Sequence, residues 1–308
     1  MNNPQVAVLL AAYNGVAWLP DQVDSILGQN GVEVTLYVSV DSSQDGTEAW
    51  FEALQAKHSN VHLLPNGLKF GGAARNFFRL VRDVDLAPFD AVAFADQDDI
   101  WYADKLARGC EAMRVQRSDA YSSNVLAFWP DGREVLVAKH QPQVRFDYLF
   151  EAAGPGCTYV FSSALACEFK SFLIAHWQEI QDVSLHDWLL YAYARSHGKR
   201  WYIDPQPSMR YRQHASNQVG VNTGMSAKKA RLRQVLSGWW LHQSLRIARL
   251  MGMQNSAFVS SWSALNARSL VRLAGASSQC RRRPRDKFYF FGLCLVLMVA
   301  ALAGRKNA

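Results

Sequence analysis

Residues 91–99 read AVAFADQDD, so that a continuous apolar run ends abruptly in three carboxylates. Such a run is typical of a strand that is buried on both faces of a parallel sheet. Residues 6–12 and 32–40 are predicted as two further strands, and they lead into Tyr13 and Asp41. Because ligands of open α/β sheets bind outside the carboxyl ends of the strands, these polar residues predict one common site.

The residues between these predicted strands show the periodicity of helices. Apolar side chains recur at spacings of three and four in residues 18–29, which predicts a helix there. Residues 47–58 and 76–85 are two further predicted helices, and a short third strand is predicted between them at 61–64. This alternation predicts an α/β fold with a Rossmann-like, mostly parallel central sheet. From about residue 120 onward, short β-like pieces and two more helices indicate strands that are added to one edge of the sheet.

The net charge of +7 is distributed unevenly along the chain. Residues 228–308 contain 15 basic residues and one acidic residue, a net charge of +14, whereas residues 1–227 contain 18 basic and 25 acidic residues, a net charge of −7. The chain is 49% hydrophobic and 12% aromatic, which excludes a disordered or fibrous protein. A basic pI suggests a nucleic-acid or anionic-membrane partner, but only the last quarter of this chain is basic.

The N-terminus and the cysteines predict a cytoplasmic protein. Residues 1–4 (MNNP) contain no basic side chain and the apolar run that follows is short, so we expect no signal peptide. The five cysteines are odd in number, widely spaced and without a Cys-x-x-Cys pair. They favour a reducing compartment over a disulfide framework or a thiolate metal site.

The acidic residues at 96–99 predict a cation site. Carboxylates at the end of a buried strand repel one another unless a cation or hydrogen-bond donors neutralise them, and oxygen ligands suit Mg²⁺ or Mn²⁺. An alternative interpretation is a turn in which Asp99 caps a helix that begins at Ile100 and Trp101. Likewise, Asp41 alone is consistent with an Asx-turn, and residues 45–47 (DGT) with a turn and helix cap.

Six segments in this order resemble motifs of the family 2 nucleotide-sugar glycosyltransferases, and those at 96–101 and 211–214 have the form seen in the rhamnosyltransferase-like branch. They are residues 11–14 (AAYN), 41–47 (DSSQDGT), 71–76 (GGAARN), 96–101 (DQDDIW), 186–188 (HDW) and 211–214 (YRQH). The resemblance spans roughly residues 5–220 and implies the A-type glycosyltransferase fold. One departure is Val40, which stands where the family often has an acid before Asp41.

The resemblance also implies roles for single residues in holding a nucleotide sugar. Tyr13, after Ala11 in the first motif, stacks on the base, Asp41 hydrogen-bonds the base, and Asp96 holds the ribose. Arg75 and Arg212 are placed to contact the diphosphate. For Arg75 the alternative is a contact to the base. Asp98 binds a divalent cation, either Mg²⁺ or Mn²⁺, and His214 is a candidate third protein ligand to this cation or a contact to the diphosphate. For His214 the alternative is a structural histidine beside two arginines.

Asp187 is the candidate catalytic base. It removes a proton from the acceptor hydroxyl while that oxygen attacks the anomeric carbon, which implies direct displacement with inversion. No second carboxylate is needed as leaving-group acid, because a metal-bound diphosphate leaves well. The alternative is that an acid is favoured there only because it lies in the first turn of a helix. Residues 154–158 (GPGCT) resemble the family's loop before the acceptor site, or form an ordinary turn.

The function predicted from the resemblance is that of a metal-dependent, inverting glycosyltransferase. It transfers rhamnose from dTDP-rhamnose to a lipid-linked O-antigen or another cell-surface polysaccharide precursor. One alternative is a UDP-hexose or UDP-N-acetylhexosamine transferase of the same family. A nucleotidyltransferase is a second alternative, but it requires a Gly-rich, basic loop after the first strand, and residues 12–16 (AYNGV) are neither. An inactive membrane scaffold is a third.

The basic C-terminal region is predicted as an extension at 223–308, after a catalytic domain at 1–222 whose nucleotide-binding half ends near 105. Residues 226–251 form a basic amphipathic stretch, and 288–303 are an apolar run of 16 residues with basic flanks. A spanning helix needs about 20 apolar residues, so shallow insertion into an anionic cytoplasmic leaflet is favoured. The alternative is a helix that packs on the catalytic domain. A nucleic-acid partner is not expected, since no recognition motif is present.

Overall fold

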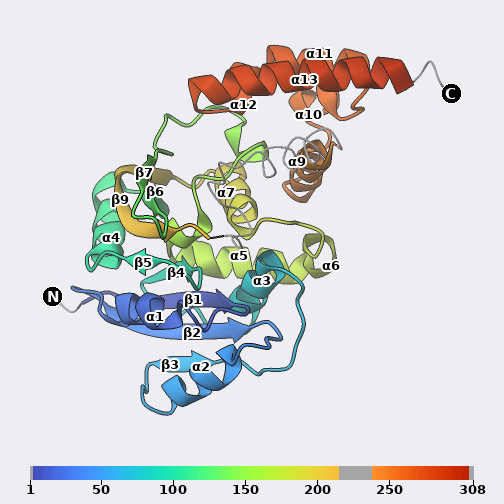
Figure 1. Cartoon of the computed structure of the whole chain (residues 1–308). Helices are drawn as coiled ribbons and strands as arrows, with labels where there is room; N and C mark the ends of the chain where they lie inside the picture. Colours follow the sequence, from blue (N-terminus) through green and yellow to red (C-terminus); the bar gives the residue numbers. More distant parts are fainter. Residues whose placement is uncertain (1–2, 215–237, 305–308) are drawn as a thin grey trace. The chain divides into compact units, whose positions relative to one another are not determined.

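The structure is a computed structural model of the chain, and it describes residues 3–214 and 238–304 (Figure 1). The contacts divide the chain into two compact units. The first comprises Met1–His140 and Ala153–Val221, and the second comprises Gln141–Ala152 and Asn222–Ala308. The predicted domain boundary near residue 222 and most of the amphipathic stretch 226–251 lie outside the described residues.

A parallel core of four strands organises the first unit, in the order β3-β2-β1-β4. The strands are β1 (Gln5–Ala12), β2 (Glu33–Val40), β3 (Val61–Leu63) and β4 (Ala91–Ala95). Every residue of β4, and every residue of β1 after Gln5, is buried, as expected for strands covered on both faces. The register pairs Ala12 with Val40 and Leu10 with Ala95, so Tyr13, Asp41 and Asp96 emerge at one edge.

Helices cover both faces of this core. The side chains of Val6, Val8, Leu10 and Ala12 share one hydrophobic cluster with residues of α1 (Leu19–Leu27), α2 (Thr47–Gln55) and α4 (Lys105–Gln116). On the opposite face α3 (Ala73–Asp83) packs on β1 and β2 and contacts α5 (Ser163–Ala175) and α7 (His186–Ser196). These layers and their doubly wound connections confirm the predicted fold class.

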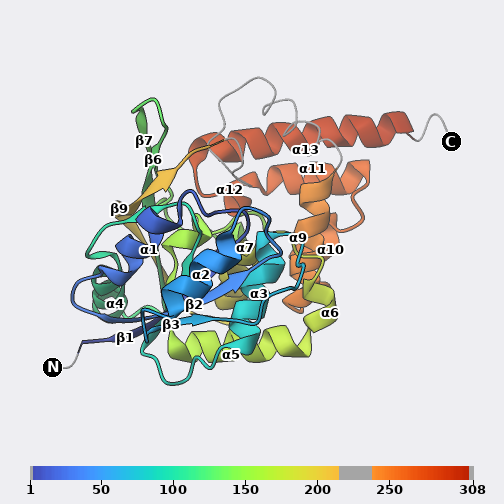
Figure 2. The same ribbon diagram turned by 60° about the horizontal axis from the view of Figure 1, so that its bottom comes forward.

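Further strands extend the sheet beyond β4, mainly by antiparallel pairing. The described sheet continues through β8 (Val160–Ser162), β6 (Ala120–Phe128) and β9 (Trp201–Arg212) to β5 (Ile100–Trp101), with β7 (Glu134–Val137) paired to β6. In Figure 2 the β6–β7 hairpin stands out at the upper left. The sheet is thus extended at one edge, as predicted.

One alternative for the acidic segment is wrong. Ile100 and Trp101 do not begin a helix; they pair with Arg210 and Met209 of β9, and α4 begins only at Lys105. Asp99 is therefore no helix cap. The carboxylates of residues 96–99 lie instead on a tight connection between two strands of the same sheet.

The second unit has a helical core of its own. It contains α9 (Trp239–Leu250), α10 (Ala257–Trp262), α11 (Ala267–Gly275), α12 (Ser277–Cys280), α13 (Pro284–Gly304) and the short 3₁₀ helix η1 (Asp147–Leu149). In Figures 1 and 2, α11 and α13 lie side by side, and α13 contacts both α11 and α12.

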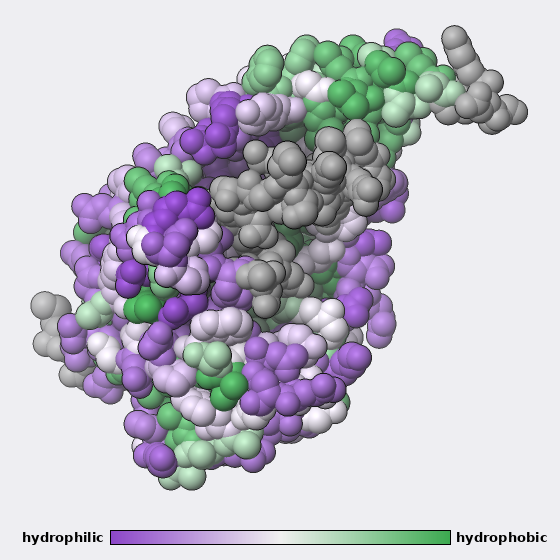
Figure 3. Space-filling view, in the orientation of Figure 1, coloured by the Kyte–Doolittle hydropathy of each residue, from purple (hydrophilic) through white to green (hydrophobic). Residues whose placement is uncertain are grey.

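The helix α13 is longer than the apolar run seen in the sequence. It has 21 residues, because Pro284 starts the helix four residues before Phe288. A 20-residue part, Pro284–Ala303, is long and apolar enough to cross a membrane by length and composition. Phe290, Cys294 and Leu297 are buried, whereas other apolar side chains of the helix are exposed and give the strongly hydrophobic surface of this unit in Figure 3.

Candidate active site

The end of β1 presents an exposed aromatic ring. The Tyr13 backbone N–H donates to Gln97 Oε1 at 2.7 Å, and Gln97 Nε2 donates to the Tyr13 carbonyl at 2.9 Å. A Cβ on Gly15 would lie 2.1 Å from Gln97 Oε1, so only glycine allows this close pairing. The Tyr13 side chain stays 56% exposed on a fixed backbone, an arrangement suited to stacking on a planar ligand.

Asp41 at the end of β2 organises the loop before α3. Its carboxylate accepts the backbone N–H groups of Ser42 and Phe70 at Oδ1 and of Gly71 at Oδ2, each at 2.9 Å. The bond from Ser42 joins neighbouring residues and is not the bond to the second residue on that defines an Asx-turn, and the bonds to residues 70 and 71 reach far along the chain. Because a carboxylate offers about four acceptor positions, the three bonds leave room for a further donor. Arg75 follows on α3, exposed, with Nε donating to the Gln181 carbonyl at 2.9 Å.

The end of β9 meets the acidic connection after β4. His214 Nε2 lies 2.6 Å from Asp98 Oδ2, and its ring stacks on Trp18 with centroids 4.1 Å apart. Arg212 donates from Nε to the Asp98 carbonyl at 2.8 Å and from its backbone N–H to Asp99 Oδ1 at 3.1 Å. Arg212 also contacts Asp21. Two residues predicted from the motif at 211–214 therefore lie directly against the motif at 96–101.

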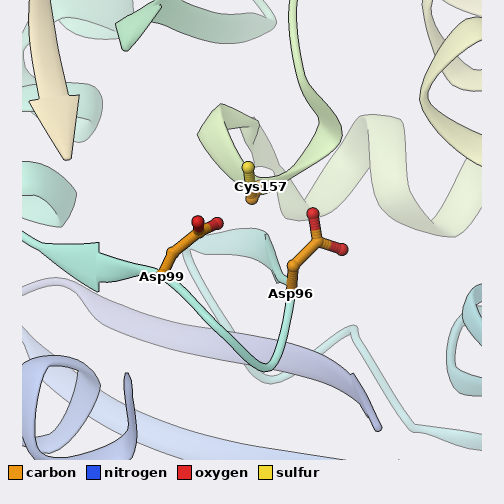
Figure 4. Close-up of side chains that lie close together, drawn as sticks. All are labelled: Asp96, Asp99 and Cys157. Carbon is orange, nitrogen blue, oxygen red and sulfur yellow. The ribbon is translucent and has the colours of Figure 1, made fainter. Parts of the chain in front are cut away.

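Asp96, Asp99 and Cys157 converge on one point. Figure 4 shows the two carboxylates, at either end of the connection between β4 and β5, pointing toward the Cys157 thiol. Their potential ligand atoms lie within 4.8 Å of one another. Asp99 and Cys157 are fully buried, and Asp99 Oδ2 has no hydrogen-bond partner. Asp99 and Cys157 are thus more enclosed than the pair of Asp98 and His214, whose side chains are 11% and 14% exposed, whereas Asp96 is partly exposed.

Burial and mutual repulsion perturb these acids. Burial, followed by the charges of Asp98 and Asp187, raises the pKa of Asp96 to about 7. The pKa of Asp99 is raised well above its usual range by burial and by Asp98 and Asp96. Burial is the first cause in both acids, and acids whose pKa is raised by burial and by neighbouring carboxylates are frequent at functional sites.

Lys105 is the buried cation beside this cluster. Its Nζ donates to the Cys157 carbonyl and lies 3.1 Å from the centroid of the Trp101 ring. Burial lowers the pKa of Lys105 to about 7, against the opposing charges of Asp99 and Asp96. Lys105 thus links α4 to the loop that carries Cys157, and its hydrogen bond goes to a carbonyl rather than to a carboxylate.

Asp187 lies in the first turn of α7, and its Oδ1 accepts the Trp188 N–H at 2.7 Å. Its side chain is partly accessible, and burial raises the pKa of its carboxyl to about 6. Its charge contributes to the raised pKa of Asp96, so the two carboxylates interact. A partly accessible carboxylate with a pKa near 6 is ionised at neutral pH and can accept a proton.

The loop before β8 packs tightly against Asp187. A Cβ on Gly156 would lie 2.6 Å from His186 Nε2 and 3.1 Å from the Asp187 Cβ. His186 is itself buried, with its ring stacked on Phe77 at 3.8 Å, and burial lowers the pKa of its imidazole to about 3. His186 is therefore neutral, and glycine at 156 permits the close approach of this loop.

The structure gathers most residues predicted from the sequence, but it adds others. Ala11 is 9% exposed within β1, and no described contact distinguishes it. Gln97, Lys105 and Cys157 were not predicted as site residues. Lys105 is the first residue of α4, where a positive charge is unfavourable because of the helix dipole. This unfavourable position is the one sequence feature that could have drawn attention to Lys105.

Comparisons with known proteins agree with this geometry. Residues 4–141 match the family described as glycosyltransferase like family 2. The dTDP-rhamnosyl transferase RfbG of Shigella flexneri is 42% identical over 291 residues, which cover 94% of this chain and 100% of that protein. WfgD of Escherichia coli, a UDP-Glc:alpha-D-GlcNAc-diphosphoundecaprenol beta-1,3-glucosyltransferase, is 30% identical over 57% of this chain and 67% of its own length.

Solved structures show the same fold. TarS 1–349 of S. aureus has a TM-score of 0.55 at 14% identity, with 99% of this chain and 92% of that chain covered. The mannosyltransferase PcManGT of Pyrobaculum calidifontis, in complex with GDP-Man and Mn²⁺, has a TM-score of 0.54 at 16% identity, with 98% and 88% covered. Together with the near full-length relative, these matches show that the chain belongs to glycosyltransferase family 2 and is a nucleotide-sugar-dependent, rhamnosyltransferase-like enzyme.

Proposed function

We propose that the enzyme transfers rhamnose from dTDP-rhamnose, with inversion, to a lipid-linked precursor of an O-antigen or another cell-surface polysaccharide. The observation that carries this proposal is Asp187, a partly accessible carboxylate beside the acidic cluster at the strand ends. The donor is inferred from the similarity to a dTDP-rhamnosyl transferase over nearly the whole chain.

The donor binds at the edge formed by β1, β2 and β4. The exposed Tyr13 ring stacks on the base, and Asp41 accepts a donor group of the base at its remaining acceptor position. Asp96, next along this edge, receives the ribose hydroxyl. Arg75 and Arg212 are the guanidinium groups for the diphosphate, and Ala11 lines the base site with a small side chain.

The divalent cation fits the pair of Asp98 and His214. A carboxylate and an imidazole 2.6 Å apart form a donor set that Mn²⁺ accepts, and the surrounding acids supply excess negative charge. The enclosed group of Asp96, Asp99 and Cys157 fits less well, because Lys105 lies against the Cys157 carbonyl and burial raises the pKa of the thiol well above its usual range. When bound, the cation stabilises negative charge on the departing diphosphate.

Asp187 acts as the single base. It takes the proton of the acceptor hydroxyl while that oxygen bonds to the anomeric carbon and the bond from this carbon to the diphosphate oxygen breaks. The new bond forms on the face opposite the leaving group, so the anomeric configuration inverts. Gly156 lets its loop lie directly against Asp187, since any side chain there collides with His186 or Asp187.

The second unit brings the enzyme to a lipid-borne acceptor at the cytoplasmic membrane surface. Its helix α13 exposes large apolar side chains, namely Phe288, Tyr289, Phe291, Val296, Val299 and Leu302. Arg283, Arg285 and Lys287 precede or open this apolar stretch. Basic residues beside aromatic ones favour an anionic interface. Because the opposite side of α13 is buried against its own unit, we favour shallow insertion over a span.

A UDP-sugar donor is the second candidate. It is favoured by the similarity to WfgD, a UDP-glucose-dependent enzyme, over 57% of the chain. The two candidates share the fold and all the residues named above, and they differ only in the base and the sugar of the donor.

The test is a donor panel. The full-length protein is incubated with dTDP-rhamnose, UDP-glucose or UDP-N-acetylglucosamine, with Mn²⁺ or EDTA, and with a synthetic acceptor in which N-acetylglucosamine is linked by a diphosphate to a short lipid. We expect release of dTDP, and rhamnosylated lipid, only with dTDP-rhamnose and Mn²⁺. If only UDP-glucose is turned over, the second candidate replaces the first. If no donor is turned over, the proposal is contradicted.

A further inference from the structure

Gln97 joins the end of β1 to the acidic connection after β4. Its carboxamide accepts the Tyr13 N–H at Oε1 at 2.7 Å and donates from Nε2 to the Tyr13 carbonyl at 2.9 Å. The backbone register of β1 with β4 ends at Leu10 and Ala95, so this side chain continues the link between the two strands beyond their own pairing. One carboxamide thus bonds both polar groups of the Tyr13 backbone.

The other side of the loop after β1 is bonded to the connection after β2. The N–H groups of Asn14, Gly15 and Val16 donate to side-chain oxygens of residues 43, 47 and 45, at 2.9 to 3.0 Å. The loop at 13–16 is therefore held on two sides. Its hydrogen bonds toward β2 are made by three successive residues, whereas those toward β4 are both made by Gln97.

Asp98, the proposed cation ligand, follows Gln97 directly. Its Oδ2 lies 2.6 Å from His214 Nε2, and its carbonyl accepts Arg212 Nε at 2.8 Å. Consecutive Cα atoms are about 3.8 Å apart across one planar peptide group. A displacement of the Tyr13 backbone that moves the Gln97 carboxamide is therefore passed to Asp98 with little chain available to absorb it.

Gly15 allows the Gln97 carboxamide to reach the Tyr13 backbone. A Cβ on Gly15 would lie 2.1 Å from Oε1 and 2.4 Å from Cδ of Gln97. Both atoms belong to the far end of a flexible side chain, so alanine at position 15 displaces the carboxamide and need not displace β1. Gly15 does not adopt a positive φ, so its backbone also accepts alanine. Gln97 can thus be detached from Tyr13 in two independent ways, by changing either Gln97 or Gly15.

We propose that Gln97 is a positioning residue that couples the base site at Tyr13 to the cation site at Asp98. A base that stacks on Tyr13 restrains the backbone to which Gln97 is bonded, and a cation at Asp98 restrains the next residue of the same connection. Each ligand therefore reduces the ordering that the other requires, and each tightens binding of the other by the same factor. This inference rests on the proposed function, which assigns the base to Tyr13 and the cation to Asp98.

The coupling is tested by the binding of Mn²⁺ with and without thymidine. Thymidine carries the base and the sugar but no phosphate, so it cannot bind the cation through a diphosphate. The Kd of the full-length protein for Mn²⁺ is measured by electron paramagnetic resonance, and the Kd for thymidine by calorimetry. In the wild type, saturating thymidine should lower the Kd for Mn²⁺ by about fivefold or more.

Two single variants and their combination should remove this effect. In Gln97→Met and in Gly15→Ala, the Kd for Mn²⁺ with and without thymidine should agree within about twofold, and the double variant should lose no more coupling than either single one. Gln178→Met is the matched control, because Gln178 is exposed on α6 (Trp177–Ile180). It should retain the coupling of the wild type.

The outcomes separate this inference from the proposed function. A wild-type protein that binds thymidine and Mn²⁺ independently of each other overturns the coupling and leaves the proposed function standing. Coupling that persists in Gln97→Met and Gly15→Ala also overturns the role of Gln97. A wild-type protein that binds neither ligand contradicts the proposed function itself, and the coupling fails with it.

Hydrogen exchange provides a readout that needs neither ligand nor activity. In Gln97→Met the Tyr13 N–H loses its acceptor, so peptides that cover residues 12–16 should exchange faster, while peptides from β3 exchange as in the wild type. Because Gln97 is partly exposed, water can replace the lost bonds and the unfolding midpoint should stay close to that of the wild type. Unchanged exchange at 12–16 overturns the proposal, since Gln97 would then not hold Tyr13.

Discussion

Both units bury carboxylates, but they neutralise them differently. In the second unit, the fully buried Asp147 meets the Arg282 guanidinium, which also pairs with Glu151. In the first unit, Asp96 and Asp99 face Asp98 and each other, and Lys105 donates to a carbonyl. The consequence is visible in the pKa of Asp96, raised to about 7. Matched charge holds a segment in place, whereas unmatched negative charge at strand ends is what a cation site requires.

The largest expected effect comes from removing the cation or its proposed ligand. Because the charges of Asp98 and Asp96 raise the pKa of Asp99 and a cation at Asp98 would offset them, EDTA should abolish nucleoside diphosphate release, and Asp98→Asn should lower kcat by at least about a hundredfold. Release of dTDP from dTDP-rhamnose measures both. Glu111→Gln, which removes an exposed acid on α4, is the matched control and should have no effect. Full activity in EDTA would contradict the difference drawn between the two units.

The two kinds of buried acid should respond in opposite directions to neutralisation. Asp147→Asn leaves Arg282 without its buried partner and should lower the free energy of unfolding by about 3–5 kcal/mol. Asp99→Asn removes a carboxylate whose pKa is raised in the folded state. Such a group destabilises the fold above its folded pKa and has no such effect below its unfolded pKa. Asp99→Asn should therefore be more stable than the wild type at pH 8 and equal to it near pH 3.

Urea unfolding of both variants at the two pH values measures this contrast. A destabilised Asp99→Asn protein at pH 8 would show that the acidic cluster is a structural ion network like that of Asp147.

An intermediate effect is expected at the exposed end of β1. Tyr13→Ala removes the ring that we propose to stack on the base, and stacking contributes about 1–3 kcal/mol per base. The Kd for dTDP should rise by roughly fivefold to a hundredfold, as measured by calorimetry, without a change in the unfolding midpoint. Tyr13→Phe retains the ring and should bind dTDP as the wild type does. Equal affinity of all three proteins would remove Tyr13 from the nucleotide site.

The smallest effect concerns the apolar surface of α13. Replacing the exposed Phe288 and Tyr289 by serine should weaken binding to vesicles that contain anionic phosphatidylglycerol by a few-fold to tenfold, because each ring inserts only partly. Cosedimentation measures vesicle binding, and raised salt should also weaken the binding of the wild-type protein. Thr47→Ser, a conservative change within the first unit, is the control. Binding of the double variant at wild-type strength would indicate that this surface does not meet the membrane.

The sequence predicted the parallel core well because its strands are continuous apolar runs, as in residues 91–95 and 6–12. It could not place residues 100–101 in a strand, since their partners in β9 lie more than 100 residues away. Nor could it assign residues 141–152 to the C-terminal unit, because that assignment depends on Arg282 and the aromatic core. Lys105 and Cys157 carry no motif of their own, and only the tertiary fold brings them to the acids. The family motifs, by contrast, pointed to both Asp98 and His214, whose side chains lie 2.6 Å apart, and their binding of a cation stays a prediction.

The central claim, that the Asp187 carboxylate is the base of the transfer, is tested most directly at that residue. The measurement is kcat/KM for the lipid acceptor from pH 5 to 8, for the wild type and for Asp187→Asn, with dTDP affinity measured in parallel. Because burial raises the pKa of Asp187 to about 6 and the base acts when ionised, wild-type activity should rise about tenfold per pH unit below 6 and level off above it. Asp187→Asn should lose about 10²- to 10⁴-fold, lose this pH dependence, and bind dTDP normally. Undiminished turnover in Asp187→Asn, with the same pH dependence as the wild type, would contradict the account.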